Sequence, residues 1–245
     1  MRMQKLTRTV RIIHYWLGVI VGLQLLIWLG TGLYFNLTPY EQLKGLNQQQ
    51  ALPTSITEQF NPNRLLPLTE ILQQFDSVEK VSMTAMLGQP IYLLDTQVTR
   101  YPHDCQQQTL VNAYSGKPVS IDAQMATQLA VQTYTSDAKV ISTQQLHPPI
   151  DAWPKQCNGL WQITVQDELN TRIYINAVNG QLVGHKNDQT DVADLMFKLH
   201  FMDYLHQGSF NNPFSWVFGL MALLLSLSGV YWVVESLAKK RYRFS

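Results

Sequence analysis

The chain has 245 residues, of which 46% are hydrophobic and 14% charged, and its formal net charge at pH 7 is +1. This near-neutral total hides a separation of charge. The two ends carry eight basic residues and one acidic residue, whereas residues 38–211 carry ten basic and sixteen acidic residues, a balance of −6. An acidic central segment offers no electrostatic footprint for a nucleic acid, so we expect no nucleic-acid partner.

Two long stretches without a charged side chain lie near the two ends of the chain. One runs from Ile12 to Tyr40 and the other from Tyr204 to Val234. A bilayer core of about 30 Å requires about 20 mostly apolar residues in helical form, and no other segment meets this requirement. The sequence therefore predicts two transmembrane helices in a lipid bilayer, over residues 12–37 and 212–235.

The first stretch is too long for the apolar core of a cleaved signal peptide, which has about 7–15 residues. No A-x-A-like cleavage site follows it, although the small residues Gly30, Thr31 and Gly32 leave cleavage open as an alternative. We interpret this stretch as an uncleaved membrane anchor.

Basic residues flank both predicted helices on their outer sides. They are Arg2, Lys5, Arg8 and Arg11 before the first helix, and Lys239, Lys240, Arg241 and Arg243 after the second. Lys and Arg beside a membrane span are retained in the cytoplasm. We therefore expect cytoplasmic tails over residues 1–11 and 236–245, with everything from about residue 38 to residue 211 on the far side of the membrane.

The only two cysteines, Cys105 and Cys157, both lie in the predicted exported segment. An oxidising compartment allows them to pair, and closing so long a loop contributes about 2–4 kcal/mol. With His103 they make no recognised zinc pattern, and the chain has no C-x-x-C-H for covalent c-type haem. We expect a disulfide, with two free thiols as the alternative.

The exported segment contains the same unit twice, and residues 38–190 are expected to form a tandem α+β domain. Each copy reads as a short helix, then extended runs, then a turn centred on glycine and an apolar pair. The expected elements are a helix over 67–75 and strands over 78–87, 90–95 and 108–113 in the first copy, and a helix over 123–134 and strands over 138–143, 160–166 and 171–177 in the second. Asn179-Gly180 in the closing turn of the second copy is a strong hairpin signal.

Residues 191–211 form a segment of a different kind. From Asp191 to His206 the apolar residues recur at helical spacing, which predicts an amphipathic helix at the membrane surface or against the domain. His206 lies on its apolar stripe, and His200 lies about a third of a turn away. Asn212 followed by Pro213 indicates an N-cap and a first helical position, so the second membrane helix is expected to begin there.

The repeated unit resembles the PepSY domain, whose helix and strands end in an x-x-G-x-v-v turn. Asn179-Gly180-Gln181-Leu182-Val183 and Ser115-Gly116-Lys117-Pro118-Val119 match this closing motif. The ends of the chain resemble the PepSY-associated membrane family through four further motifs. These are His14-Tyr15-Trp16-Leu17-Gly18, Thr31-Gly32-Leu33, Leu205-His206-Gln207-Gly208 and Ser228-Gly229-Val230.

Together with the two predicted spans, the resemblance implies an α+β membrane protein in which two transmembrane helices flank an exported tandem PepSY-like domain. We expect a two-pass protein of the bacterial inner membrane with a periplasmic domain. Members of the family are often four-helix proteins associated with iron uptake and ferric-siderophore reduction, and some carry b-type haem on membrane histidines. The present chain departs from that pattern because it has only two predicted spans.

Three histidines are candidate ligands of a b-type haem: His14, His206 and, as the weaker choice, His200. Gly18 and Gly22 follow His14 at nearly the same face of the helix and would leave room for a flat macrocycle. The alternative for His14 is an interfacial belt residue, with the two glycines serving helix packing. A histidine on an apolar stripe, such as His206, is more often a packed residue than a ligand. The remaining histidines, His103, His147 and His185, are interpreted as surface residues of loops or turns.

Bis-histidine ligation requires two imidazoles at the same depth of the membrane. The second helix has no histidine over 230–235 to oppose His14, and the first has none over 30–37 to oppose His206. One chain therefore cannot build such a site alone, whereas a homodimer brings each histidine to its own copy and a membrane partner subunit could supply the second ligand.

No enzyme signature is present, since the sequence has no Gly-rich dinucleotide motif, P-loop, H-E-x-x-H or nucleophile elbow. A reductase role would need an electron donor from elsewhere. Three classes of function stay open: a b-type haem-binding electron-transfer subunit linked to iron acquisition or respiration, a non-catalytic periplasmic binding or inhibitory module like the PepSY units of protease propeptides, and a structural accessory anchor.

Overall fold

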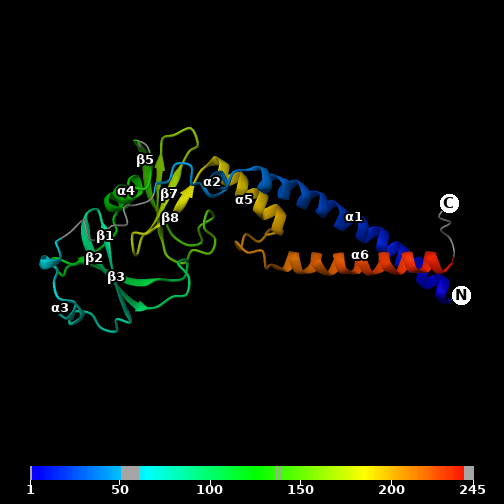
Figure 1. Cartoon of the computed structure of the whole chain (residues 1–245), viewed down its shortest axis with the longest axis horizontal. Coiled ribbons are helices and arrows are strands. Elements are labelled where there is room, and N and C mark those ends of the chain that lie inside the picture. Colours follow the sequence, from blue (N-terminus) through cyan, green and yellow to red (C-terminus); the bar gives the residue numbers. More distant parts are fainter. Residues whose placement is uncertain (1, 51–60, 136, 138, 240–245) are drawn as a thin grey trace. The chain divides into compact units, whose positions relative to one another are not determined.

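The computed structural model describes residues 2–50, 61–135, 137 and 139–239 (Figure 1). The chain divides into two compact units, one formed by Met1–Thr38 with Asp194–Ser245 and the other by Pro39–Ala193. The first contains two long apolar helices and the second contains two antiparallel sheets with short helices. This confirms the expected fold class, an α+β region flanked by two apolar helices. The basic residues expected at 240, 241 and 243 lie outside the described residues.

The two long helices are α1 (Arg2–Leu37) and α6 (Pro213–Ala238), which lie side by side (Figure 1). Segments Arg8–Leu37 and Pro213–Ala238 are long and apolar enough to cross a membrane. The helices pack through a small apolar core that includes Val21, Met202 and Phe218. Most other large apolar side chains of both helices are exposed, which is the arrangement a lipid environment requires.

Helix α6 begins where its sequence predicts. The Asn212 side chain accepts a hydrogen bond from the backbone N–H of Ser215 at 3.1 Å, and the Ser215 hydroxyl faces the backbone N–H of Asn212 at 3.4 Å. Pro213 occupies the first helical position. This capping box satisfies N–H groups that the first turn of a helix would otherwise leave unpaired.

The helix preceding α6 differs from the expectation. Helix α5 spans Asp188–Phe201, so it begins earlier and ends earlier than the amphipathic helix expected up to His206. The chain leaves the helix at Met202, whose φ is +53°, and His206 lies beyond it with a φ of +55°. The prediction of a helical His206 on an apolar stripe is therefore wrong.

In the α+β unit, helix-then-strands order occurs twice, and each copy forms its own four-stranded antiparallel sheet. The first copy consists of α3 (Leu68–Leu72), β1 (Lys80–Met86), β2 (Gln89–Gln97), β3 (Gln107–Asn112) and β4 (Pro118–Val119). The second consists of α4 (Ala123–Val131), β5 (Val140–Leu146), β6 (Leu160–Val165), β7 (Arg172–Asn176) and β8 (Leu182–Lys186). Strands pair with their sequence neighbours throughout, as in a meander. A short helix α2 (Tyr40–Lys44) and a 3-10 turn η1 (Pro62–Arg64) precede them.

One core joins the two sheets. Ile91 and Leu110 of the first sheet, Ile163 and Ile173 of the second, and Leu129 of α4 are all buried in it. The opposite face of the first sheet packs on α3 through Ile71, and the opposite face of the second is covered by the loop that carries Ile150 and Trp153. The two copies therefore form a single folded unit.

The closing turns of the two copies are built identically. In the first, the backbone N–H of Gly116 donates to the Asn112 carbonyl at 2.9 Å, and in the second the N–H of Gly180 donates to the Asn176 carbonyl at 2.9 Å. Both glycines have left-handed φ values, +69° and +68°, which side chains other than glycine rarely adopt. The hairpin predicted at Asn179-Gly180 is confirmed, and it connects β7 to β8.

The interpretation of His185 as a surface residue is wrong. It lies on β8 and only 1% of its surface is exposed. Gly45, at the end of α2, approaches the backbone here so closely that a Cβ would lie 2.5 Å from the His185 carbonyl oxygen. Its φ of +68° likewise requires glycine. His103 and His147 do lie in loops.

Candidate functional site

The helix pair carries a polar contact at each of its two ends, and each contact joins a histidine to a hydroxyl. At one end, the Nδ1 atom of His14 on α1 lies 2.9 Å from the hydroxyl oxygen of Ser228 on α6. The ring meets Trp232 edge-on, with ring centroids 5.6 Å apart. It also lies against Gly229, where a Cβ would come within 3.2 Å of the imidazole Cε1. We refer to this as the His14 end.

The other end has a similar arrangement, in which α1 supplies the hydroxyl and α5 supplies the histidine. The Nδ1 atom of His200 on α5 lies 2.8 Å from the hydroxyl oxygen of Thr31 on α1. Its ring stacks on Trp28, with centroids 6.0 Å apart, and a Cβ at Gly32 would lie 3.7 Å from the imidazole Cε1. We refer to this as the His200 end. Of the two histidines predicted as alternatives for this end, His200 and not His206 packs onto the helix pair.

The structure does not bring the two histidines together. His14 and Thr31 are 17 residues apart on α1, which corresponds to about 25 Å at about 1.5 Å per residue. The two imidazoles therefore lie at opposite ends of the apolar part of the helix pair. Each end holds one imidazole of the chain, flanked by an aromatic ring and by a glycine of the neighbouring helix.

His206 lies in the turn between α5 and α6 and is exposed. The turn is organised by Asp203, which is buried and accepts hydrogen bonds from the backbone N–H groups of Gln207 at 2.9 Å and Gly208 at 2.7 Å. The Leu205-His206-Gln207-Gly208 motif is thus a surface turn whose backbone N–H groups donate to one buried carboxylate.

Charged side chains surround the His14 end. Arg11 contacts Glu235 at 3.4 Å and lies over the Trp232 ring, and Lys239 forms a second ion pair with Glu235. The Glu235 side chain is only 10% exposed. A carboxylate this enclosed is tolerated because two cations neutralise it.

The two glycines of the Gly18-x-x-x-Gly22 motif lie in different environments. A Cβ at Gly18 would contact Leu225 of α6 at 3.9 Å, whereas a Cβ at Gly22 would meet nothing within 4 Å. Gly18 therefore serves packing inside the chain, and only Gly22 is left open for the approach of another helix or a ligand.

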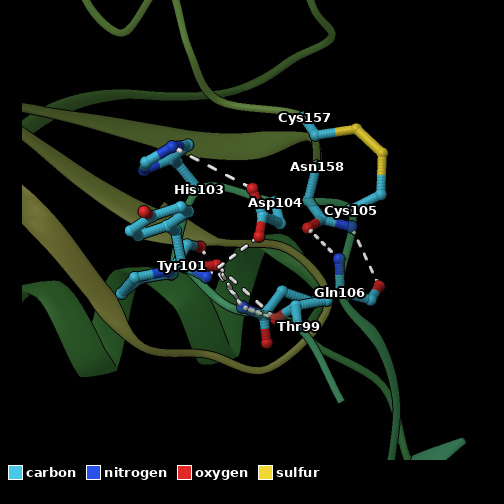
Figure 2. The surroundings of a disulfide bond; sticks show 9 residues. Thr99, Tyr101, His103, Asp104, Cys105, Gln106, Cys157 and Asn158 are labelled. Carbon is cyan, nitrogen blue, oxygen red and sulfur yellow. Dashed lines mark hydrogen bonds and ion pairs between the residues drawn. A yellow bond between two sulfur atoms is a disulfide. The ribbon is translucent and has the colours of Figure 1, made fainter. Parts of the chain in front are cut away.

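The disulfide joins the two copies of the repeat. Cys105 precedes β3 in the first copy and Cys157 precedes β6 in the second, and their Cα atoms lie 4.9 Å apart (Figure 2). Across the bridge, the Gln106 N–H donates to the Asn158 side chain at 2.8 Å, and the Asn158 amide donates back to the Gln106 carbonyl at 3.1 Å. The bond therefore belongs to a braced junction between the copies.

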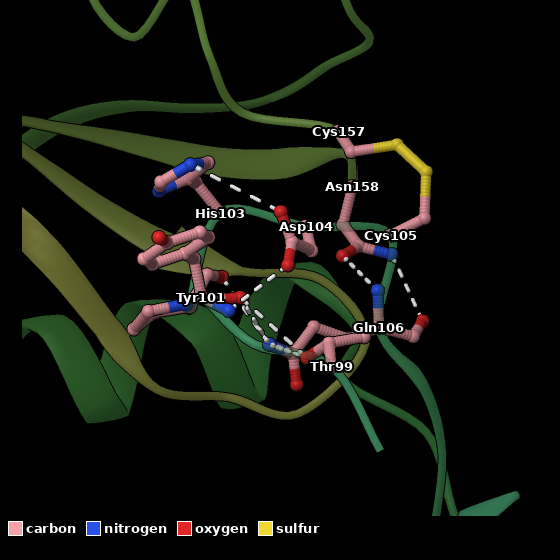
Figure 3. A network of polar contacts seen from close by, with 9 residues as sticks. Thr99, Tyr101, His103, Asp104, Cys105, Gln106, Cys157 and Asn158 are labelled. Atoms are coloured by element: carbon pink, nitrogen blue, oxygen red, sulfur yellow. Dashed lines mark hydrogen bonds and ion pairs between the residues drawn. A yellow bond between two sulfur atoms is a disulfide. The ribbon is translucent and has the colours of Figure 1, made fainter. Parts of the chain in front are cut away.

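The loop before the disulfide is held by further polar contacts (Figure 3). Asp104 accepts a hydrogen bond from the backbone N–H of Tyr101 at 2.9 Å, and His103 stacks on the Tyr101 ring with centroids 5.3 Å apart. Within the described ranges, no three His, Cys, Asp or Glu side chains lie close enough to hold a metal ion.

Thr31 and Ser228 belong to motifs that could be identified in the sequence, but no role was predicted for their hydroxyls. The signal was the recurrence of one pattern, a hydroxyl residue followed by glycine, near the end of each membrane helix. What the sequence alone could not supply is that each hydroxyl meets a histidine 169 or 214 residues away along the chain.

The fold and the helix pair define a membrane-associated protein with a two-sheet α+β region. The sequence matches the family described as PepSY-associated TM region over residues 11–245, so the chain belongs to this family. This confirms the resemblance seen in its motifs. No curated protein and no solved structure matches the chain.

Proposed function

We propose that the protein is a two-pass inner-membrane electron-transfer subunit that binds b-type haem through His14 and His200. Such a cofactor supplies one-electron transfer when it is bound, and histidine is its usual ligand in proteins. The observation that carries the proposal is the placement of one imidazole at each end of an apolar helix pair, in an equivalent aromatic and glycine-flanked environment.

The type of ligand suits a b-type haem, but one chain supplies too few ligands at each end. Each end offers one imidazole packed on the helix pair, and a neutral ring nitrogen of histidine is a usual haem ligand. A second ligand at the same depth must come from another chain. A homodimer with a two-fold axis along the membrane normal supplies it at both ends with one interface, and this is the assembly we propose.

His200 is preferred to His206 as the ligand at the second end. His200 lies against α1 between Trp28 and Phe35, whereas His206 is exposed in a polar turn. A ligand enclosed by apolar groups keeps water from the site and holds one ring orientation. The Asp203 turn is then a support for the segment between α5 and α6.

The orientation in the membrane is proposed from the charge distribution. The basic residues in the first turns of α1 and those after α6 favour cytoplasmic termini, with His14 on the cytoplasmic side and His200 on the periplasmic side. The α+β region is then periplasmic, an oxidising compartment in which the Cys105–Cys157 bridge persists. Two sites about 25 Å apart along the helix would serve electron movement across the membrane.

The test is a reduced-minus-oxidised absorption spectrum of the full-length protein, expressed with ample haem supply and purified as a dimer in detergent. Wild type is expected to show a b-type band. His14→Ala and His200→Ala should each remove about half of the bound haem, because each removes both ligands of one site in a two-fold dimer.

His206→Ala and His147→Ala are the matched controls, since both histidines lie in loops, and both variants should keep the full band. A pure dimeric wild type without the band would overturn the proposal and would favour the non-catalytic periplasmic binding or accessory module. A band that survives both ligand substitutions would show that the assigned histidines are wrong.

A further inference from the structure

We propose that Ser228 and Thr31 are positioning residues that set the tautomers of His14 and His200, so that the Nε2 atom of each imidazole carries the free lone pair. The proposal concerns which ring nitrogen is protonated in this chain. Its consequence for ligand binding rests on the proposed haem function, whereas the tautomers themselves are measurable without it.

The hydroxyl of Ser228 has a single proton, and that proton is already engaged. Its oxygen lies 2.8 Å from the backbone carbonyl oxygen of Leu225, three residues earlier on the same helix. A carbonyl oxygen only accepts hydrogen bonds, so the hydroxyl donates to it. The 2.9 Å contact between this hydroxyl and His14 Nδ1 must then be donated by the imidazole, which places the proton on Nδ1.

Thr31 is arranged in the same way. Its hydroxyl donates to the Ile27 carbonyl oxygen at 2.7 Å, four residues earlier on α1. The 2.8 Å contact with His200 Nδ1 is therefore also donated by the imidazole. Two histidines at opposite ends of the helix pair thus receive the same tautomer from hydroxyls on two different helices.

The glycine that follows each hydroxyl completes the arrangement. A Cβ at Gly229 would lie 3.2 Å from His14 Cε1, tight enough to displace the ring, and one at Gly32 would lie 3.7 Å from His200 Cε1. The hydroxyl fixes the protonated nitrogen and the glycine lets the ring lie against the helix. Because hydroxyl-then-glycine occurs at both ends, the pairing is a repeated structural device.

The tautomer decides which ring nitrogen of each histidine can bind a ligand. Free neutral histidine favours the proton on Nε2, which would leave Nδ1, the nitrogen closer to the backbone, as the ligand atom. A hydroxyl that accepts a hydrogen bond from Nδ1–H reverses this preference. The Nε2 atom is then the nitrogen that can coordinate. Outer-sphere acceptors of this kind orient ligating histidines and raise their basicity.

The chain offers a matched control for the Ser228 substitution and a rescue variant for both hydroxyls. Ser226 lies on the same helix as Ser228, and its hydroxyl donates to the Ala222 carbonyl at 2.9 Å in the same way, but it is exposed. Ser226→Ala therefore removes an equivalent hydroxyl from α6 without altering an imidazole contact. Ser228→Thr and Thr31→Ser keep the hydroxyl and serve as rescue variants.

The experiment uses full-length protein labelled with 15N at histidine, purified without haem in detergent micelles and studied by NMR at alkaline pH. Assignments come from His14→Gln and His200→Gln. Wild type is expected to show Nδ1–H for both residues. Ser228→Ala should move only His14 toward the Nε2–H form, and Thr31→Val should move only His200, whereas Ser226→Ala, Ser228→Thr and Thr31→Ser should leave both unchanged.

Nε2–H forms in wild type, or tautomers unaffected by Ser228→Ala and Thr31→Val, would overturn the proposal. A second readout separates it from the proposed function. In protein that binds haem, each hydroxyl deletion should weaken haem binding at its own end by about 10- to 100-fold, the usual effect of losing an outer-sphere partner. If the tautomers are as expected but no haem binds, the positioning role stands and the proposed function fails.

Discussion

His185 shows how one residue can make the stability of this protein depend on pH. It is 1% exposed, and burial lowers its pKa to about 4. Its Nε2 atom lies 2.8 Å from the Thr133 hydroxyl, whose own proton is donated to the Ala130 carbonyl. The imidazole is thus held neutral inside the α+β unit, since a charged ring would lose its hydration.

This burial predicts an acid-sensitive fold. Because the folded pKa of about 4 lies below the unfolded value of 6.5, protons bind the unfolded state first. Stability contributed by the neutral ring is complete above pH 6.5 and should fall by about 3 kcal/mol between pH 6.5 and pH 4. The measurement is hydrogen exchange of the β7 amides in full-length protein, corrected for the intrinsic exchange rate at each pH.

His185→Gln should be less stable at pH 7 but should lose this segment of pH dependence, whereas the loop variant His147→Gln should keep it. An unchanged dependence of stability on pH in His185→Gln would contradict the prediction.

Asp167 affects stability at lower pH. Burial opposes its ionisation, but hydrogen bonds from Thr171, Tyr134 and the Leu169 N–H hold its pKa below the usual value. Its contribution is therefore lost only as the pH falls further.

At the scale of elements, the two copies of the repeat are joined by features that act as one junction. The disulfide closes a separation of 52 residues, and the paired Gln106 and Asn158 hydrogen bonds lie beside it. A cross-link over a loop of this length restricts the unfolded chain considerably, so the bond should contribute more to stability than to chemistry.

We therefore predict that Cys105→Ser with Cys157→Ser destabilises the α+β unit by about 4 kcal/mol, the chain-entropy value for such a loop. Hydrogen exchange of the β3 and β6 amides in full-length protein, measured as a function of urea concentration, gives this loss of unfolding free energy. The haem spectrum should be unchanged because the bond lies in the other compact unit. Two free thiols in wild type, found by alkylation and non-reducing mass spectrometry, would refute the pairing.

For the whole molecule, the predicted orientation decides on which side of the membrane His14, His200 and the disulfide lie. Reporter fusions after Ser245 should read as cytoplasmic, and fusions near Gln107 should read as exported. The physical reason is the retention of Lys and Arg on the cytoplasmic side of both spans. An exported C-terminus would remove the oxidising compartment from the disulfide and would exchange the sides proposed for His14 and His200.

The two membrane helices, the start of α6 and the repeated order of helix and strands could be predicted from the amino-acid sequence. These features follow from local chemistry. A span requires only about 20 apolar residues, the Asn212 and Pro213 pair caps its own helix, and Gly180 permits its own turn. Each signal lies within a few residues of the element that it specifies.

The environments of His14, His185, His200 and His206 could not be predicted, because they depend on contacts between distant segments of the folded chain. Helix α5 ends at Phe201, and the Asp203 carboxylate accepts hydrogen bonds from backbone N–H groups of the following turn. His206 is therefore exposed in this turn, whereas His200 contacts Thr31. The contact between His14 and Ser228 spans 214 residues of chain, and the burial of His185 depends on packing against Gly45 and Thr133. A pattern within one segment cannot encode such contacts, because the partner is chosen by packing between segments.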